Sequence, residues 1–141
     1  MAADDSSARP SRAARIIGPD QGRKYVLHQS TATFIADGAE TNDRYSISEW
    51  AYAPGTGGPG AHAHDGLDHV FYIIEGTLSV FVGGQWLDAA QGSYVVIPGG
   101  TRHDFSNRGK SVTRFVNFEV PGGFESALRR FATSVGDPAR D

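Results

Sequence analysis

The sequence predicts an all-β protein, built as an antiparallel sandwich or barrel with one short helix near the C-terminal end. From Ile16 onward, short runs of β-branched and aromatic residues alternate with glycine, proline and asparagine turn signals. No helical period separates these runs, and strands that follow one another without helices pair in antiparallel fashion. A length of 141 residues suits a single domain with one core.

The first fifteen residues, Met1–Arg15, are rich in alanine, serine and arginine and have no hydrophobic period. Such a segment buries too little apolar surface to offset the entropy of ordering it. We therefore expect a disordered N-terminal tail over residues 1–15, followed by one domain over residues 16–141. Asp4 and Asp5 argue against an organelle transit peptide.

Three strands are expected in the first part of the domain. They cover Tyr25–His28, Thr33–Ile35 and Tyr45–Ala53. The next loop, Pro54–Gly60, is rich in glycine, but it lacks the Lys-Ser/Thr pair of a phosphate-binding loop and no helical pattern follows it. The glycines are better explained by a tight approach of this loop to the strand that follows.

Five further strands and one helix are expected in the rest of the chain. The strands cover Val70–Ile74, Leu78–Val82, Gln85–Asp88, Ser93–Ile97 and Val112–Val120. The helix covers Phe124–Thr133, where Phe124, Leu128 and Phe131 share one face. This face is expected to pack on the sheets or on a second subunit.

Four of the five histidines lie in two short stretches. His62 and His64 alternate, which directs both imidazoles to one side of an extended segment. His69 opens the next apolar run, and His103 follows a Pro-Gly-Gly turn that could bring it back beside them. Neutral imidazoles bind zinc, iron, copper and nickel, whereas protonated imidazoles would repel one another. The sequence therefore predicts one divalent metal ion per chain, bound by His62, His64, His69 and His103.

The two stretches resemble the two sequence motifs of the cupin superfamily. The first motif spans residues 62–76 and the second spans residues 92–107. The matching residues are His62, His64, His69 in place of the usual glutamate, and Gly76, then Gly92, Pro98, Gly99, His103 and Asn107. The resemblance implies a double-stranded β-helix, also called a jelly roll or cupin barrel.

Histidine at position 69 departs from the usual set of three histidines and one carboxylate. Four neutral ligands give the centre one more unit of positive charge, which makes the metal a stronger Lewis acid and raises its reduction potential. Asp68 is a conceivable substitute, but it would point to the opposite face of the strand. His69 is therefore preferred as the fourth ligand.

If His69 and His103 point inward, strand alternation predicts which side chains surround them. The resulting pocket is aromatic and apolar, and it suits a planar or hydrophobic substrate. Its candidate wall residues are Trp50, Tyr52, Phe71, Ile73, Phe105, Phe115 and Asn117, and the candidate bases are Glu49 and Glu119. In the other register of the early strand, Glu49 and Ala51 face inward instead of Trp50 and Tyr52. Aromatic residues of this kind also fill cores, and the sequence fits either role.

Three functions are compatible with a four-histidine centre that keeps coordination positions open. The first is a dioxygenase in which iron or manganese binds an enolate or catecholate beside dioxygen and a carbon–carbon bond is cleaved. The second is a non-redox isomerase, lyase or polyketide-cyclase-type enzyme that uses zinc or nickel as a Lewis acid. The third is a binding protein without turnover. We favour the first.

The composition bears on partners and location. A net charge of −3 gives no basic footprint for nucleic acid or an anionic membrane. No apolar run has the length of a transmembrane helix or a signal peptide, so a cytoplasmic protein is expected. The absence of cysteine excludes disulfides and thiolate ligands. The family resemblance also implies a homodimer.

Overall fold

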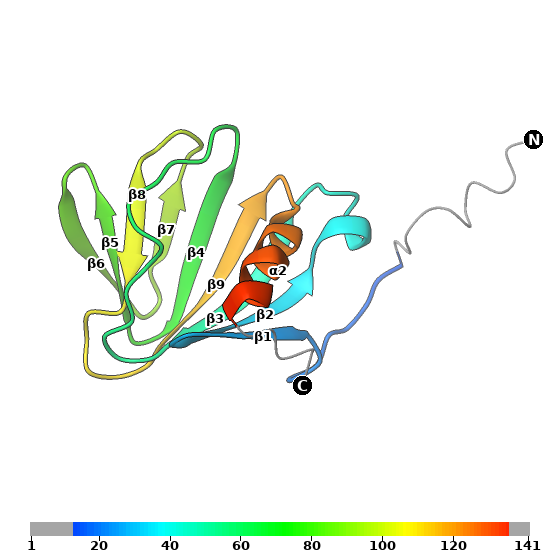
Figure 1. Cartoon of the computed structure of the whole chain (residues 1–141), viewed down its shortest axis with the longest axis horizontal. Helices are drawn as coiled ribbons and strands as arrows, with labels where there is room; N and C mark the ends of the chain where they lie inside the picture. The colour runs from blue at the N-terminus through cyan, green and yellow to red at the C-terminus, as the bar shows by residue number, and fades with distance from the viewer. Residues whose placement is uncertain (1–12, 136–141) are drawn as a thin grey trace, which may run out of the picture.

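The computed structural model describes residues 13–135, which form two antiparallel β-sheets and a C-terminal helix (Figure 1). The large sheet has the strand order β1-β2-β3-β9-β4-β7, and the small sheet has the order β6-β5-β8. The strands are β1 (Arg23–Leu27), β2 (Ser30–Ala36), β3 (Ser46–Tyr52), β4 (Asp68–Glu75), β5 (Thr77–Val82), β6 (Gln85–Ala90), β7 (Tyr94–Ile97), β8 (His103–Ser106) and β9 (Thr113–Val120). The predicted all-β class is confirmed.

Two elements were not predicted. Strand β8 has only four residues and includes His103 and Asp104, so no apolar run marks it in the sequence. A 3-10 helix, η1 (Gly38–Glu40), replaces a simple turn after β2, and the side chain of Asp37 caps it. The predicted helix is present as α2 (Phe124–Val135), although the side chain of Phe131 lies outside the described part of the structure.

The core lies between the sheets, where alternate residues of each strand face inward. On β4 the side chains of Phe71 and Ile73 are fully buried, whereas Tyr72 between them is 38% exposed. On β3 the side chains of Trp50 and Tyr52 face inward, which settles the register that the sequence left open. Ring contacts join strands across the interior, with centroids 5.1 Å apart for Phe71 and Phe105.

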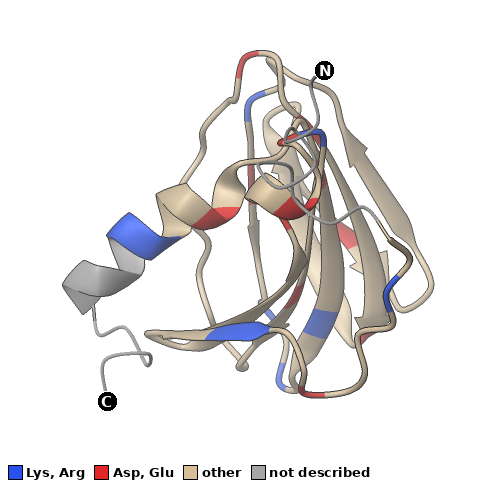
Figure 2. Cartoon of the chain, turned by 90° about the vertical axis from the view of Figure 1, so that its right-hand side faces the viewer, with Lys and Arg blue, Asp and Glu red and all other residues tan. Residues whose placement is uncertain are grey.

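Helix α2 lies on one side of the large sheet (Figure 2), and the contacts described next hold its N-terminal end. Phe124 packs against the rings of Phe34 and Trp50, with centroids 5.8 and 6.2 Å apart. The carboxylate of Asp37 accepts hydrogen bonds from the backbone N–H groups of Gly123 and Glu125, each at 2.6 Å. Apolar packing and backbone capping therefore hold the same end of the helix.

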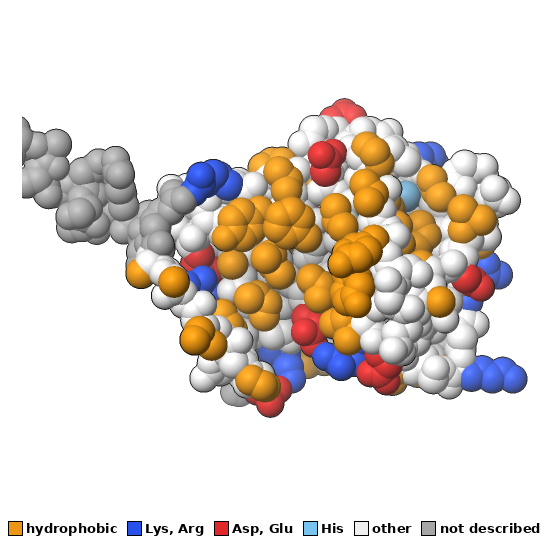
Figure 3. Space-filling model, turned by 180° about the vertical axis from the view of Figure 1, so that it is seen from behind, with side chains coloured by type: hydrophobic (Ala, Val, Ile, Leu, Met, Phe, Trp, Pro, Cys, Tyr) orange, Lys and Arg blue, Asp and Glu red, His pale blue; other side chains and the backbone are white. Residues whose placement is uncertain are grey.

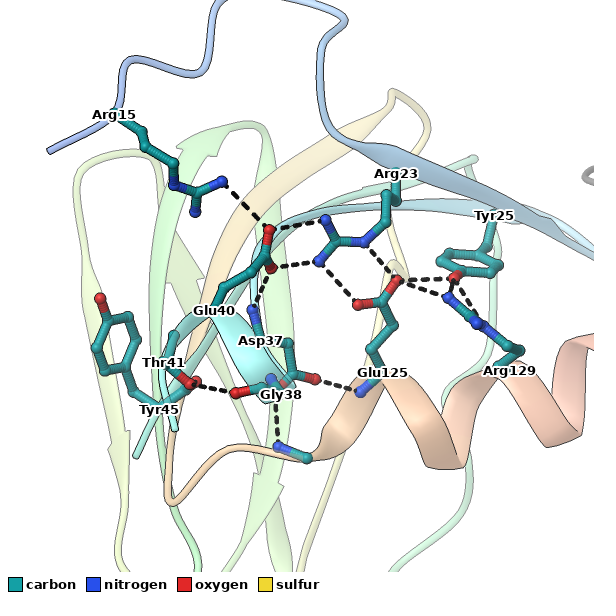
Figure 4. A network of polar contacts seen from close by, with 11 residues as sticks. Arg15, Arg23, Tyr25, Asp37, Gly38, Glu40, Thr41, Tyr45, Glu125 and Arg129 are labelled. Carbon is teal, nitrogen blue, oxygen red and sulfur yellow. Dashed lines mark hydrogen bonds and ion pairs between the residues drawn. The ribbon is translucent and has the colours of Figure 1, made fainter. Parts of the chain in front are cut away.

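A charged network joins this helix end to β1 and η1 (Figure 4). The guanidinium of Arg23 donates to Glu125 at 2.8 Å and to Glu40 at 2.6 Å. Arg15, which lies in the segment expected to be a tail, pairs with Glu40 at 3.2 Å. The rest of that segment, residues 1–12, lies outside the described residues. Hydrogen bonding from Arg23 lowers the pKa of Glu40 from 4.5 to about 2.

Glu40→Gln is expected to lower the free energy of unfolding at neutral pH by on the order of 1 kcal/mol. The pKa of Glu40 is about 2 when folded and 4.5 when unfolded. The stabilisation is therefore complete above about pH 4.5 and is lost as the pH falls toward 2. Denaturant unfolding across this range measures it. Glu49→Gln, which removes a partly exposed carboxylate paired with Arg114 on the sheet's outer face, is the control. If Glu40→Gln lowers the free energy of unfolding as much at pH 2 as at pH 7, the stabilisation does not come from the ionised carboxylate of Glu40.

The outer face of the large sheet exposes apolar side chains. Figure 3 shows hydrophobic side chains over a wide area of the molecule's back. The edge strand β7 exposes 68% of Tyr94 and 66% of Val96, and the ring of Tyr94 lies 4.7 Å from that of Tyr72 on β4. Exposed apolar faces of this kind are typical of protein contacts. No helix among the described residues is long and apolar enough to cross a membrane.

A second copy of the chain is expected to cover this face, because β7 is both an unpaired edge and apolar on its outer side. Val96→Lys should convert a dimer to a monomer in light scattering coupled to gel filtration. Val26→Lys is the matched control, because Val26 is 46% exposed on the opposite edge strand, β1. A monomeric wild-type protein, or a Val96→Lys variant that stays dimeric, would reject this interface.

Candidate metal centre

Three histidine side chains come together at one end of the interior. His62 and His64 lie on the extended segment before β4, and His103 is the first residue of β8. The backbones of His62 and His103 exchange two hydrogen bonds of 2.8 Å, which places the two residues side by side. One ligand nitrogen from each of the three histidines lies within 4.8 Å of the others. A set of this kind can hold a metal ion.

His69, the second residue of β4, borders this cluster, but its ring nitrogens are not among the three that meet within that distance. Its ring centroid lies 5.2 Å from that of His64 and 5.4 Å from that of His103. Its Nε2 atom is buried and has no hydrogen-bond partner, and the same is true of Nε2 in His103. Two buried nitrogens without partners are unfavourable unless a ligand engages them.

Oxygen acceptors engage Nδ1 in three of the four rings. Nδ1 of His62 lies 2.6 Å from the carbonyl oxygen of Gly60, and Nδ1 of His103 lies 2.9 Å from that of Thr101. Nδ1 of His69 lies 3.2 Å from Oδ1 of Asn117. A carbonyl oxygen only accepts, so each Nδ1 must carry the proton and each Nε2 keeps its lone pair. This is the arrangement that metal-binding histidines use.

The electrostatics favour neutral rings. Burial lowers the pKa of His64, of His103 and of His69, the last to about 4, and the neighbouring imidazoles act in the same direction. At neutral pH these rings are therefore uncharged. A divalent cation would meet unprotonated nitrogen in a partly dry setting.

Hydrogen bonds and one close backbone approach connect the segments around the histidines. The N–H of Gly100 donates to the carbonyl of His64 at 2.9 Å, and the N–H of Gly99 donates to the carboxylate of Asp68 at 2.8 Å. Any side chain at Gly58 would meet the carbonyl oxygen of Phe105 on β8, because a Cβ atom there would lie 1.8 Å from it. The glycine-rich loop does approach a strand closely at this residue, but that strand is β8, which carries His103, and not the strand that follows the loop.

The predicted pocket residues lie beneath the histidines and pack on one another. Phe71 and Phe105 contact the rings of His69 and His103, with centroids 5.6 and 6.4 Å apart. Trp50, Tyr52, Ile73 and Phe115 are buried among the core residues. A cavity of about 490 Å³ lies elsewhere, at the glycine-rich loop, with Trp86 and Arg108 in its lining. The aromatic residues thus form a closed floor under the site.

The two candidate bases are on opposite sides of the sheet. Glu49 lies on the outer face, where its side chain is 40% exposed and paired with Arg114, because the inward positions of β3 belong to Trp50 and Tyr52. Glu49 therefore does not reach the histidines. Glu119 is 1% exposed, and its Oε2 lies 3.1 Å from Nδ1 of His69. Burial raises the pKa of Glu119 to about 7.

Sequence reasoning missed the acceptors that orient the rings. The carbonyls of Gly60 and Thr101 each lie two residues before the histidine that they orient, a spacing that the sequence alone does not mark as a contact. The contact of Asn117 and Glu119 with His69 depends on β9 lying next to β4, with His69 opposite Glu119. No local signal predicts that pairing, since 37 residues, 76–112, separate the end of β4 from the start of β9. His69 and Asn117 themselves lie 48 positions apart in the chain.

Comparisons with known proteins agree with the motifs. The model of the cupin domain family matches residues 48–119, just over half of the chain. Quercetin 2,3-dioxygenase of Bacillus subtilis (strain 168) is 26% identical over 118 residues, which cover 84% of this chain and 33% of that protein. The chain thus spans about one third of the length of this relative.

Solved structures share the fold. KdgF from Halomonas sp. superposes with a TM-score of 0.70 at 14% identity, covering 81% of this chain and 99% of that one. The polyketide cyclase RemF from Streptomyces resistomycificus superposes with a TM-score of 0.67 at 19% identity, covering 77% of this chain and 80% of that one. Likeness at these identities concerns the fold alone, and with the family match it confirms the predicted double-stranded β-helix.

His62→Ala or His103→Ala is expected to lower the bound metal by at least about tenfold, because each removes a nitrogen from the cluster. Elemental analysis of protein purified without a histidine tag measures this. His28→Ala is the matched control, because His28 is exposed in the turn between β1 and β2. Unchanged metal content in His103→Ala would remove that residue from the set of ligands.

Proposed function

Because the chain belongs to the cupin family, we propose that it is a metal-dependent dioxygenase that acts on a small organic molecule. Its substrate is an enolisable or catecholic compound, and a carbon–carbon bond is cleaved. The ion, iron or manganese in preference to zinc or nickel, is bound by His62, His64, His69 and His103. The observation that carries the proposal is a set of imidazoles in which Nδ1 of His62, His69 and His103 lies against an oxygen acceptor. Nε2 of His69 and of His103 is buried and has no hydrogen-bond partner.

The choice of redox chemistry rests on the curated relative. Quercetin 2,3-dioxygenase matches 84% of this chain, including both histidine stretches, although this match covers only 33% of its own length. A dioxygenase places both atoms of O2 in its products, so the reaction needs no external reductant.

The chain's own residues would position the reactants. A bound divalent ion supplies a Lewis acid for an ionised substrate oxygen and a redox partner for dioxygen. Phe71 and Phe105 close the site from below and exclude water on that side. His62 and His64 are only partly buried, so the substrate would approach from their side. An apolar floor beside a cationic centre favours a planar substrate with one acidic oxygen.

His69 is the ligand that separates this chain from the usual cupin pattern. Its ring centroid lies 5.2 Å from that of His64 and 5.4 Å from that of His103, closer than His64 and His103 lie to each other. With His69 bound, all four protein ligands are neutral, and the full charge of the ion is available to stabilise an anionic substrate. Fe(II) or Mn(II) accepts such ligands and retains positions for a substrate.

Oxygen uptake tests the proposal. Protein loaded with iron or manganese is expected to consume oxygen with a panel of enolisable and catecholic compounds, and His103→Ala is expected to reduce the rate at least about a hundredfold. His28→Ala is the control. Turnover without oxygen in the zinc or nickel form would support a non-redox enzyme instead. Binding of a panel compound with no product would support a binding protein.

A further inference from the structure

His69, Asn117 and Glu119 form a buried polar cluster behind the histidines. We propose that Glu119, acting both directly and through Asn117, fixes the tautomer of His69 in which Nε2 is free to bind a metal ion. Glu119 is thus a positioning residue rather than a ligand. The proposal rests on the four-histidine centre proposed above.

The pairing of β4 with β9 brings the three side chains together. His69 lies opposite Glu119 in the register of these strands, and Asn117 is two residues from Glu119, so it shares the inward face. The exposed fractions are 5% for His69, 4% for Asn117 and 1% for Glu119. With so little access to water, the hydrogen bonds of the cluster must be satisfied from within.

The donors and acceptors of the cluster leave one consistent arrangement when Glu119 is ionised. A carboxylate only accepts hydrogen bonds, so Asn117 must turn its NH2 group toward Glu119, and this contact measures 3.0 Å. Oδ1 of Asn117 then faces His69, where it lies 3.2 Å from Nδ1, and Oε2 of Glu119 lies 3.1 Å from the same nitrogen. Because both oxygens only accept, Nδ1 must carry the ring proton. Nε2 is left with its lone pair, and no protein group occupies it.

A glutamine at position 119 would remove this constraint. Its amide can donate as well as accept, so the amide of Asn117 is free to turn over and present NH2 to the ring. His69 would then carry its proton on Nε2, and that nitrogen could no longer bind a metal ion. Loss of an orienting group of this kind typically lowers metal affinity by about 10–100-fold.

Glu119→Gln is therefore expected to lower the affinity for cobalt(II) about 10–100-fold in competition with a chelator. In metal-free protein, ¹⁵N NMR should find the ring proton of His69 on Nδ1 in the wild type, and on Nε2 or on both nitrogens in the variant. Glu49→Gln, which alters a carboxylate on the outer face, is the matched control and should change neither result.

A double variant separates orientation from folding. Asn117→Asp placed in the Glu119→Gln protein restores a group that only accepts beside Nδ1. It is expected to return His69 to the Nδ1–H form and to recover most of the cobalt affinity, which a merely structural defect would not allow.

Two results would overturn the proposal. One is a wild-type His69 that carries its proton on Nε2, and the other is a folded Glu119→Gln variant with unchanged tautomer and cobalt affinity. Failure of the proposed function would look different. In that case the wild type binds no iron, manganese or cobalt, while the tautomer measurement, which needs no metal, still reports on Glu119.

Discussion

Several imidazole rings share one end of the barrel interior, and they can do so only while they are uncharged. Protonating one ring would place a cation in a partly dry site beside its neighbours, and both burial and mutual repulsion oppose this. A neutral ring has one donor and one acceptor nitrogen. The carbonyls of Gly60 and Thr101 take the donor of His62 and of His103, so the acceptor nitrogens remain for a ligand.

The fold keeps these rings together through its backbone. The two motif segments are far apart in the sequence, yet His62 pairs with His103 and His64 with Gly100 through main-chain hydrogen bonds. Gly58 allows the preceding loop to rest on β8, where a side chain would collide with the backbone. The positions of these histidines are thus set by main-chain contacts, which hold them more firmly than long flexible side chains could.

The sequence predicted the features that depend on local spacing. The alternation of His62 and His64, the turn before His103 and the strand runs are all readable from neighbouring residues. The sequence did not predict which residues of β3 face inward, because either alternate set could do so. The structure shows that Trp50 and Tyr52 are the buried set. The contact of His69 with Asn117 and Glu119 was also out of reach, since it follows from a crossover that pairs β4 with β9.

This crossover also bears on the missing glutamate of the first motif. A carboxylate is still present, but Glu119 supplies it from the neighbouring strand, with Oε2 3.1 Å from Nδ1 of His69. Under the proposed function, the buried site would keep one negative charge while the metal ion would have only neutral ligands. The charge of Glu119 would then act through the ring of His69, where it makes Nε2 more basic without occupying a coordination position. A carboxylate that contacts a histidine ligand, instead of binding the ion itself, would therefore still orient that ligand. The full charge of the ion would then be available to the substrate.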